Sequence, residues 1–480
     1  MKNIPVVVCK GHQDSGRRYV VLPDVFQADN PNHQDRLWQK DSVWQAHVRD
    51  LKDFPRPMSV LEVCGGCSSG FIALRLLLDA LKANLAGYYD SNSVLERLVR
   101  PVHGRCEEDL VKLGKWHANI LKMAATDFPL SDIIVAGPPC PPWSDMGNKR
   151  SFSDPRAAVF WKTVDIVIHQ GCHDQLMFFV LENVRGIMKK RKDDAEAPVK
   201  LIVRRLQEGL GERFDIELLL LNTWDFGLPQ NRPRAYIVGR RKATFTMGRP
   251  TAIMPFEGQV DFGSILQVEG VPPQKEYTEI QAQNILDFKK KYKAQMDDPG
   301  QRGKYMVIDV SRSPTDRTTW GSGAHKPNRV QCLTASGPTL HAFALGEGSS
   351  GVLSVDRKLH GCEHGRLQGF PSCVIDASVT LTQASAKKAF GNAMSIPVIG
   401  SVIARELRAY QQAYRVAANV GPGRSPGSGS SMDASGSANA SPMIDSARSG
   451  GSASSSRGTP PSAAIVPIPD RQDVWETLME

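Results

Sequence analysis

The sequence has no apolar run long enough to cross a membrane, and it has no dense, even set of cysteines. Without such a run no helix is expected to span a bilayer, and the apolar stretch near Met1 is too short for a secretory signal. Nine cysteines scattered over 480 residues favour a reducing compartment over a disulfide framework. We therefore expect a protein that is neither secreted nor embedded in a membrane.

The sequence also lacks a large excess of positive over negative charge. The chain has 59 Lys and Arg against 50 Asp and Glu, a net charge of +9, which permits a polyanionic partner without demonstrating one. Hydrophobic residues at 41% and charged residues at 23% are close to a globular average, so a sizeable core can form. Residues 421–464 contain no aromatic residue and are rich in Ser, Gly, Ala and Pro, which is typical of disorder.

Short apolar runs alternate with helical stretches between about residues 56 and 240. This rhythm predicts an α/β fold with a doubly wound, mostly parallel sheet. The expected strands are 59–63, 86–89, 132–136, 178–181 and 235–238. The expected helices are 71–85 and 157–169, with a long helical region over 383–410.

A glycine-rich turn follows the first of these strands, over residues 64–70. Glycines let a ligand approach the backbone, and Asp90, which ends the next strand, could accept hydrogen bonds from a ribose. The pattern fits NAD, FAD or S-adenosylmethionine, but the phosphate-binding G-x-G-x-x-G is absent, which favours S-adenosylmethionine. A plain strand–turn–helix junction is the alternative. Cys64 and Cys67 have no second pair at zinc spacing, so we interpret them as turn residues.

Cys140 follows a buried strand and is flanked by two prolines on each side. Proline fixes φ, so this loop presents the thiol in a preset direction, which favours a nucleophile over a structural cysteine. Glu182 ends another strand and should lie at the same edge of the sheet, although a lone acid there can also be merely solvated. Arg232 and Arg234 precede a further strand, where they could be solvated or could hold an anion or a base carbonyl.

Taken in order, these segments resemble the DNA (cytosine-5) methyltransferase family over about Val60 to Ala413. The resemblance lies in six short motifs: Pro139-Cys140, Asp154-Pro155-Arg156, Glu182-Asn183-Val184, Gln230-x-Arg232-x-Arg234, Arg366-Leu367-Gln368-Gly369-Phe370-Pro371 and Gly391-Asn392-Ala393. Pro141 and Asn119 depart from the residues that the family commonly has there.

The resemblance implies an S-adenosylmethionine-dependent methyltransferase fold and a reaction at C5 of a cytosine flipped out of double-stranded DNA. Cys140 would add to C6, and Glu182 would assist at N3. Arg234 would hold the base carbonyl, and Arg232 would lie near the thiol, where positive charge should favour the thiolate.

The resemblance also implies the cofactor, S-adenosyl-L-methionine, and the residues that contact it. These are Glu62, Gly66, Ser69, Gly70, Asp90, Asn119, Pro138 and Asn392. No metal is required by this chemistry.

The expected organisation is discontinuous. Residues 1–55 are a flank of unknown role, and residues 56–240 are the first part of the catalytic domain. Residues 241–370 form a small loop-rich target-recognition domain. Residues 371–416 are the closing helical part of the catalytic domain, and residues 417–480 are a disordered tail. The basic run Lys189–Lys192 could touch DNA, serve nuclear import or be solvated, and the run Lys289–Lys293 could contact phosphate or be solvated. The expected compartment is the nucleus in a eukaryote and otherwise the cytoplasm.

Two rival functions stay open. One is a tRNA cytosine-5 methyltransferase on the same fold, although the Cys-Phe-Thr tripeptide of that branch does not occur in residues 200–260. The other is a catalytically silent homologue that only binds DNA or a partner. The presence of both Cys140 and Glu182 argues against the second.

Overall fold

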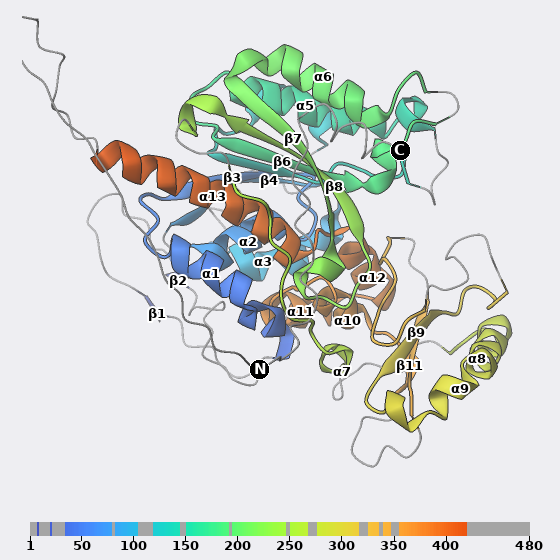
Figure 1. Cartoon of the computed structure of the whole chain (residues 1–480). Coiled ribbons are helices and arrows are strands. Elements are labelled where there is room, and N and C mark those ends of the chain that lie inside the picture. The colour runs from blue at the N-terminus through green and yellow to red at the C-terminus, as the bar shows by residue number, and fades with distance from the viewer. Residues whose placement is uncertain are drawn as a thin grey trace, which may run out of the picture. The chain divides into compact units, whose positions relative to one another are not determined.

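Six strands form the central sheet of the protein, a computed structural model (Figure 1). Neighbouring strands follow the order β4-β3-β5-β6-β8-β7. The first four are parallel, whereas β8 is antiparallel to both β6 and β7. The bounds are β3 Met58–Val63, β4 Ala83–Tyr89, β5 Ile133–Ala136, β6 Phe178–Val184, β7 Phe214–Asn222 and β8 Pro233–Arg241.

The structure describes part of the chain, and contacts group residues 1–416 into one unit. The described residues are 7–8, 20–21, 34–78, 82–103, 119–144, 150–191, 194–245, 250–266, 276–315, 325–335, 339–346 and 355–419. The predicted disordered tail beyond residue 419 therefore lies outside the described residues.

Helices cover both faces of the sheet: α5 and α6 lie on one face, and α2, α3 and α13 lie on the other (Figure 1). The predicted fold class, a doubly wound and mostly parallel sheet, is confirmed. The helices are α1 Ser42–Leu51, α2 Ser69–Leu77, α3 Glu96–His103, α5 Ala157–Gly171, α6 Pro198–Leu210, α7 Phe262–Ile265, α8 Glu279–Lys291, α9 Lys293–Met296, α10 Gly361–Arg366, α11 Ser372–Ser378, α12 Gln383–Asn392 and α13 Ile396–Asn419. Among the described residues, no helix is long and apolar enough to cross a membrane.

The long helical region expected over 383–410 is present as two helices, α12 and α13, separated by residues 393–395. Two other details of the expected secondary structure were wrong. The helix expected over 71–85 ends at Leu77, and residues 83–85 already belong to β4. Strand β7 was missed, although its run Leu218–Leu221 is apolar. It pairs along its whole length with β8 and forms one edge of the sheet.

The first described helix packs against the catalytic core through two tryptophans. Trp38 lies in the 3-10 helix η1 (Gln34–Lys40) and Trp44 lies in α1, and each is 2% exposed. Their rings meet edge to face at 4.8 Å, and both lie within 6.5 Å of the ring of Phe256. A Cβ on Gly400 of α13 would lie 2.7 Å from the Trp44 ring, so glycine is needed there. Residues 34–55 of the flank, whose role was unknown from the sequence, thus contribute to the hydrophobic core.

A second, three-stranded antiparallel sheet has the order β11-β10-β9, with bounds Asp356–Lys358, Leu340–Ala344 and Tyr305–Asp309. Helix α8 packs against it through Ile285 and Phe288. Buried His341 bonds Tyr277 at 2.5 Å and Asp356 at 2.8 Å. Two shorter β-strands, β1 Val7–Val8 and β2 Val20–Val21, pair with each other.

Candidate active site

The loop after β5 carries Cys140 and closes into a tight turn. The Cys140 carbonyl accepts hydrogen bonds from the amides of Trp143 and Ser144, each at 3.0 Å. The Asn183 side-chain amide donates to the carbonyl of Pro138 at 3.1 Å. At the start of the loop, a Cβ on Gly137 would lie 4.0 Å from Glu182 Oε2. The parallel strands β5 and β6 therefore bring the cysteine loop and Glu182 to one edge of the sheet, as predicted.

Glu182 and Arg234 form a buried ion pair. Arg234 Nε lies 3.1 Å from Glu182 Oε1, and the two residues are 9% and 7% exposed. Arg234 also donates to the carbonyl of Pro233 at 2.9 Å and to the sulfur of Cys332 at 3.5 Å. The guanidinium is thus held in a fixed orientation between a carboxylate and a thiol.

Burial dominates the proton affinities of this group. It raises the pKa of the Cys140 thiol above its ordinary value, because the lowering by Arg234 and Arg232 is smaller than the cost of desolvation. The positive charge of Arg234 and Arg232 does favour the thiolate, as expected, but burial of the thiol outweighs it. Burial likewise raises the pKa of Glu182, against the influence of the same two arginines. In the resting site both groups hold their protons more tightly than in water.

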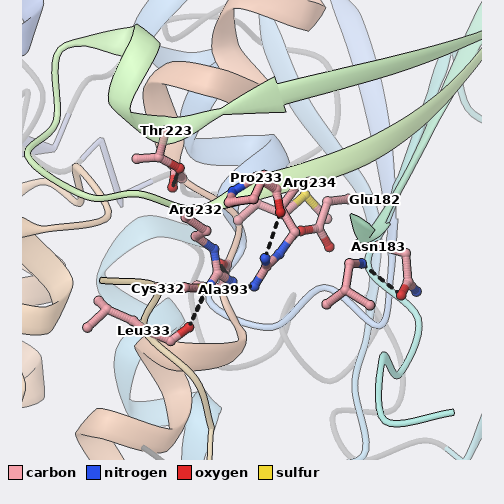
Figure 2. A network of polar contacts seen from close by, with 12 residues as sticks. Glu182, Asn183, Thr223, Arg232, Pro233, Arg234, Cys332, Leu333 and Ala393 are labelled. Carbon is pink, nitrogen blue, oxygen red and sulfur yellow. Dashed lines mark hydrogen bonds and ion pairs between the residues drawn. The ribbon is translucent and has the colours of Figure 1, made fainter. Parts of the chain in front are cut away.

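Arg232 turns away from this pair and bonds the backbone of two distant segments (Figure 2). Its guanidinium donates to the carbonyls of Leu333 at 2.5 Å, Gly391 at 3.1 Å and Ala393 at 2.8 Å. Arg232 is only 2% exposed. Arg232 thus acts as a structural clamp. Its charge nevertheless lowers the pKa of the Cys140 thiol, so the expected place of Arg232 near the thiol agrees with the structure, and its contact with a flipped nucleotide stays a prediction.

A second set of polar contacts joins the same segments. The amide of Gln230 donates to the Leu367 carbonyl at 2.8 Å and to Gln368 Oε1 at 3.2 Å. Gln368 accepts a hydrogen bond from Ser395 at 2.5 Å, and the hydroxyls of Ser395 and Thr223 lie 2.7 Å apart. These buried side chains explain why motifs far apart in the sequence meet.

The glycine-rich loop is organised by Glu62, which is 1% exposed. Its carboxylate accepts the amides of Gly70 at 2.9 Å and Phe71 at 3.1 Å, and a hydrogen bond from the hydroxyl of Ser68. Burial raises the pKa of Glu62 to about 7. Cys64 and Ser68 have φ of 51° and 60°, a conformation that residues with a Cβ rarely adopt and that is common at functional loops. Glu62 therefore shapes the loop from within.

Asp90 lies at the end of β4 and is half-buried. It accepts the amides of Gly66 at 3.0 Å and Asn92 at 2.9 Å. The space beside the Cα of Gly66 is open, with nothing within 4 Å of a Cβ built there. An open backbone next to a carboxylate at the carboxyl edge of a sheet fits a nucleoside ligand.

The remaining predicted cofactor residues divide into buried and exposed ones. Ser69 donates to the carbonyl of Met394 at 3.1 Å, and Gly70 packs on Val135 where a Cβ would lie 2.8 Å away. Asn119 is exposed and caps a short helical turn by accepting the amide of Leu121 at 3.1 Å.

Asn392 has an exposed side chain, while the carbonyls on either side of it are held by Arg232. A Cβ on Gly391 would lie 2.4 Å from the Thr334 carbonyl oxygen, so only glycine fits before it. The clamp therefore presents Asn392 outward in a fixed position.

Cys64 and Cys67 are free thiols, and burial raises the pKa of each far above its ordinary value. Within the described ranges, no group of three or more His, Cys, Asp or Glu side chains could hold a metal ion.

Three residues of the site were missed in the sequence. Asn183 belongs to a quoted motif but received no role, Cys332 lies in an unpatterned stretch, and Arg191 was interpreted only as part of a basic run. The contacts that bring them to the site, to Pro138, Arg234 and Trp143, each join residues at least 45 positions apart. Local periodicity carries no signal for such contacts.

Comparison with known proteins agrees with this geometry. The sequence profile of the C-5 cytosine-specific DNA methylase family matches residues 113–408. The type II methyltransferase M.HpaII of Haemophilus parainfluenzae is 32% identical over 273 residues, which are 56% of this chain and 69% of the relative. The type II methyltransferase M1.ScrFI of Lactococcus lactis subsp. cremoris is 27% identical over 304 residues, 62% of this chain and 68% of the relative.

The solved Dnmt2 methyltransferase of S. pombe has 19% identity and a TM-score of 0.46, covering 72% of this chain and 97% of that one. The fold assignment is based on the strand order and on the profile match, because a TM-score of this size does not establish a fold. With the profile spanning more than half of the sequence and the motifs meeting at one edge of the sheet, the chain belongs to the C-5 cytosine-specific DNA methylase family, and its enzyme class is DNA cytosine-5 methyltransferase.

Proposed function

We propose that this chain transfers a methyl group from S-adenosyl-L-methionine to C5 of a cytosine flipped out of double-stranded DNA. The observation that carries the proposal is the meeting of three groups at the carboxyl edge of β5 and β6. The Cys140 loop, the buried Glu182 carboxylate and the Arg234 guanidinium are close enough to shift one another's proton affinity. A nucleophile beside a carboxyl that keeps its proton suits addition to a pyrimidine ring.

The reaction needs a nucleophile because C5 of cytosine is a poor one. The Cys140 thiolate forms a bond to C6 while Glu182 delivers its proton to N3, so electron density moves to C5. After methyl transfer, loss of the C5 proton returns electrons to the ring. The bond between Cys140 and C6 then breaks with its electrons on sulfur, and N3 returns its proton to Glu182, which releases 5-methylcytosine and the thiolate.

Arg234 has two tasks in this scheme. Its Nε lies 3.1 Å from Glu182 and holds that carboxyl in place. The same guanidinium would donate a hydrogen bond to the carbonyl oxygen of the base. Arg232 acts through the backbone it holds, so we propose it as a positioning residue and not as a group that touches the base.

S-adenosyl-L-methionine supplies the methyl group on a sulfonium. The residues that fit it are the open backbone at Gly66, the carboxylate of Asp90 and the exposed side chains of Asn119 and Asn392. Glu62, Ser69 and Gly70 are buried and would support the loop from below. Pro138, whose carbonyl accepts from Asn183, would line the side nearest Cys140.

DNA is the substrate that the family implies, and a base inside a duplex cannot reach a half-buried thiol without being flipped. We propose residues 241–370 as the target-recognition part and the segments before and after it as the two catalytic parts. In the run Lys289–Lys293, Lys289 pairs with Asp356, and Lys293 pairs with Asp297 at 2.6 Å. Lys290 is exposed and better suited to contact phosphate. The compartment, nucleus in a eukaryote and otherwise cytoplasm, stays a prediction.

Labelled methyl transfer to duplex DNA and to tRNA, measured side by side, tests the substrate. We expect label in DNA from the wild-type chain and none from Cys140→Ala. Label only in tRNA would overturn the DNA assignment.

Duplex DNA that contains 5-fluorocytosine tests the covalent step, because fluorine at C5 cannot leave as a proton and the adduct persists. A stable protein–DNA band should form with the wild type and fail to form with Cys140→Ala. Absence of both label and adduct in the wild type would favour a catalytically silent homologue.

A further inference from the structure

Arg191 belongs to the basic run Lys189–Lys192, but its surroundings differ from those of Lys189 and Lys190. Lys189 and Lys190 are exposed, whereas Arg191 is half-buried and turns toward the cysteine loop. Its Nη2 donates to the carbonyl of Trp143 at 2.5 Å. Trp143 lies three residues after Cys140, at the end of the turn that carries the thiol.

The Trp143 carbonyl is also pressed against Gly186. A Cβ built on Gly186 would lie 2.0 Å from that oxygen and 3.6 Å from Arg191 Nη2. Since no side chain fits at this distance, the glycine allows the loop to lie directly on the short helix η6 (Arg185–Met188). The carbonyl is therefore held from two sides.

The other end of the loop is fastened from the same segment. Asn183 donates to the carbonyl of Pro138 at 3.1 Å, two residues before Cys140. The stretch 182–191 thus carries Glu182 and contacts the cysteine loop both before and after the nucleophile. This arrangement ties the position of Cys140 to that of Glu182.

Burial of the Arg191 guanidinium is unfavourable in free energy. Its Nε and Nη1 are buried and have no hydrogen-bond partner among the residues that the structure describes, although buried donors are nearly always paired in folded proteins. Leaving them unpaired costs free energy that an apolar side chain of similar length would avoid. An arginine with one strong contact to the catalytic loop is consistent with a role in the reaction.

We propose that Arg191 is a positioning residue for catalysis, which fixes the Cys140 thiol relative to Glu182 by holding the Trp143 carbonyl. The proposal rests on the proposed function of the same site. Trp143 itself is fully buried against the rings of Phe152 and Phe160. Holding its carbonyl therefore connects the cysteine turn to the core.

A contact to DNA phosphate is the rival role for a basic residue here. It is disfavoured because Nη2 is already bonded to the Trp143 carbonyl and the other nitrogens are shielded from solvent. The two roles differ in what they change. A positioning residue alters the rate at saturating DNA, whereas a phosphate contact alters the affinity for DNA and its dependence on salt.

The test compares Arg191→Met, which keeps length but has no donor, with Arg191→Lys, which keeps one donor, and with Lys190→Met as the matched control. The full chain is assayed for single-turnover methyl transfer to unmethylated duplex DNA of mixed sequence. We expect the rate at saturating DNA to fall about 10- to 100-fold in Arg191→Met, to recover in part in Arg191→Lys and to be unchanged in the control. A raised Kd for DNA with an unchanged maximal rate would instead show a phosphate contact and overturn the proposal.

A second readout does not depend on methyl transfer. Alkylation of Cys140 by iodoacetamide, followed by mass spectrometry, reports how tightly the loop is held. The thiol should react several-fold faster in Arg191→Met than in the wild type or in Lys190→Met. Equal alkylation rates in all three proteins would refute the positioning role, and this comparison still decides the matter if the wild type transfers no methyl group.

Discussion

The guanidinium of Arg234 faces the carboxylate of Glu182 at 3.1 Å, with both side chains almost excluded from solvent. The two residues lie on the antiparallel strands β8 and β6, where Arg234 pairs with Val184 in the register. Glu182 and Val184 are two positions apart, so their side chains share a face of the sheet. The strand register thus places the carboxylate of Glu182 and the guanidinium of Arg234 together.

Removing either partner of this pair should reduce methyl transfer. Glu182→Gln cannot deliver a proton to N3, and we expect its kcat to fall by about 10² to 10⁴. Arg234→Lys replaces a planar fork by a point charge and should lose part of that activity. Glu212→Gln, at an exposed acid paired with Lys242, is the control. Steady-state assays with labelled cofactor provide the measurement, and a Glu182→Gln enzyme of wild-type rate would contradict the assigned role.

The thiol of Cys140 should become more reactive as the pH rises above neutrality. Burial raises the pKa of Cys140 above its ordinary value, about 8.5 for a free thiol, so more thiolate forms as the pH increases. Methyl transfer also needs the proton of Glu182, whose pKa is raised as well. In the wild type kcat/KM should therefore climb while Glu182 keeps its proton and then level off, because the gain in thiolate is offset by the loss of that proton. In Glu182→Gln only the thiol titrates, and its residual kcat/KM should keep climbing between about pH 7 and 9. A flat profile of Glu182→Gln over this range would rule out the thiol as the titrating group.

Arg232 should matter more for folding than for contact with the base. Arg232→Met removes the guanidinium that donates to the carbonyls of Leu333, Gly391 and Ala393. We expect unfolding in urea to show a loss of at least about 2 kcal/mol. Asn231→Ala, at the exposed neighbouring position, should cost less than about 0.5 kcal/mol. An Arg232→Met protein of unchanged stability would argue against the clamp.

Glu62 should contribute to the free energy of unfolding, and this contribution should decrease as the pH rises. Its folded pKa of about 7 lies above the value of about 4.3 for an unperturbed Glu. The protonated form is therefore favoured by folding, and this contribution is fully present below about pH 4 and lost as the pH rises through about 7. The Tm of the wild type minus that of Glu62→Gln should decrease between about pH 5 and 8. Glu208→Gln, at an exposed position of α6, should show a constant difference.

The flank before β3 should be indispensable. Trp44 is 2% exposed and packs on Trp38, Phe256 and Gly400. Trp44→Ala opens a large cavity and should cost about 3–5 kcal/mol in urea unfolding. Gln45→Ala, exposed on the same helix, is expected to be near neutral. A small effect at Trp44 would mean that the flank is an independent appendage.

The positions of Cys140 and Glu182 in the fold could be predicted because the ends of buried strands can be recognised in the sequence. Cys140 and Glu182 each follow an apolar run, and parallel neighbours must place them at one edge. The helix over 71–85 was predicted too long because the run after Leu77 has no glycine or proline to stop it before residue 87. Strand β7 was missed although Leu218–Leu221 is a plain apolar run.

The roles of individual polar groups could not be predicted. Arg232 and Arg234 look equivalent in the sequence, yet one bonds backbone carbonyls and the other bonds Glu182. The difference arises from which segment passes beside each side chain after folding. The net proton affinity of Cys140 was also out of reach, since it depends on burial that only the folded loop creates.

The acceptors of Arg232 have a consequence for how the enzyme matures. The carbonyls of Gly391 and Ala393 follow Arg232 by 159 and 161 residues, so the strand that carries Arg234 is synthesised long before its support exists. A nascent chain on the ribosome that stops short of α12 would contain Cys140 and Glu182, while Arg232 would lack these two acceptors. We therefore expect that Cys140 is synthesised early but becomes reactive only after the last helices have been added.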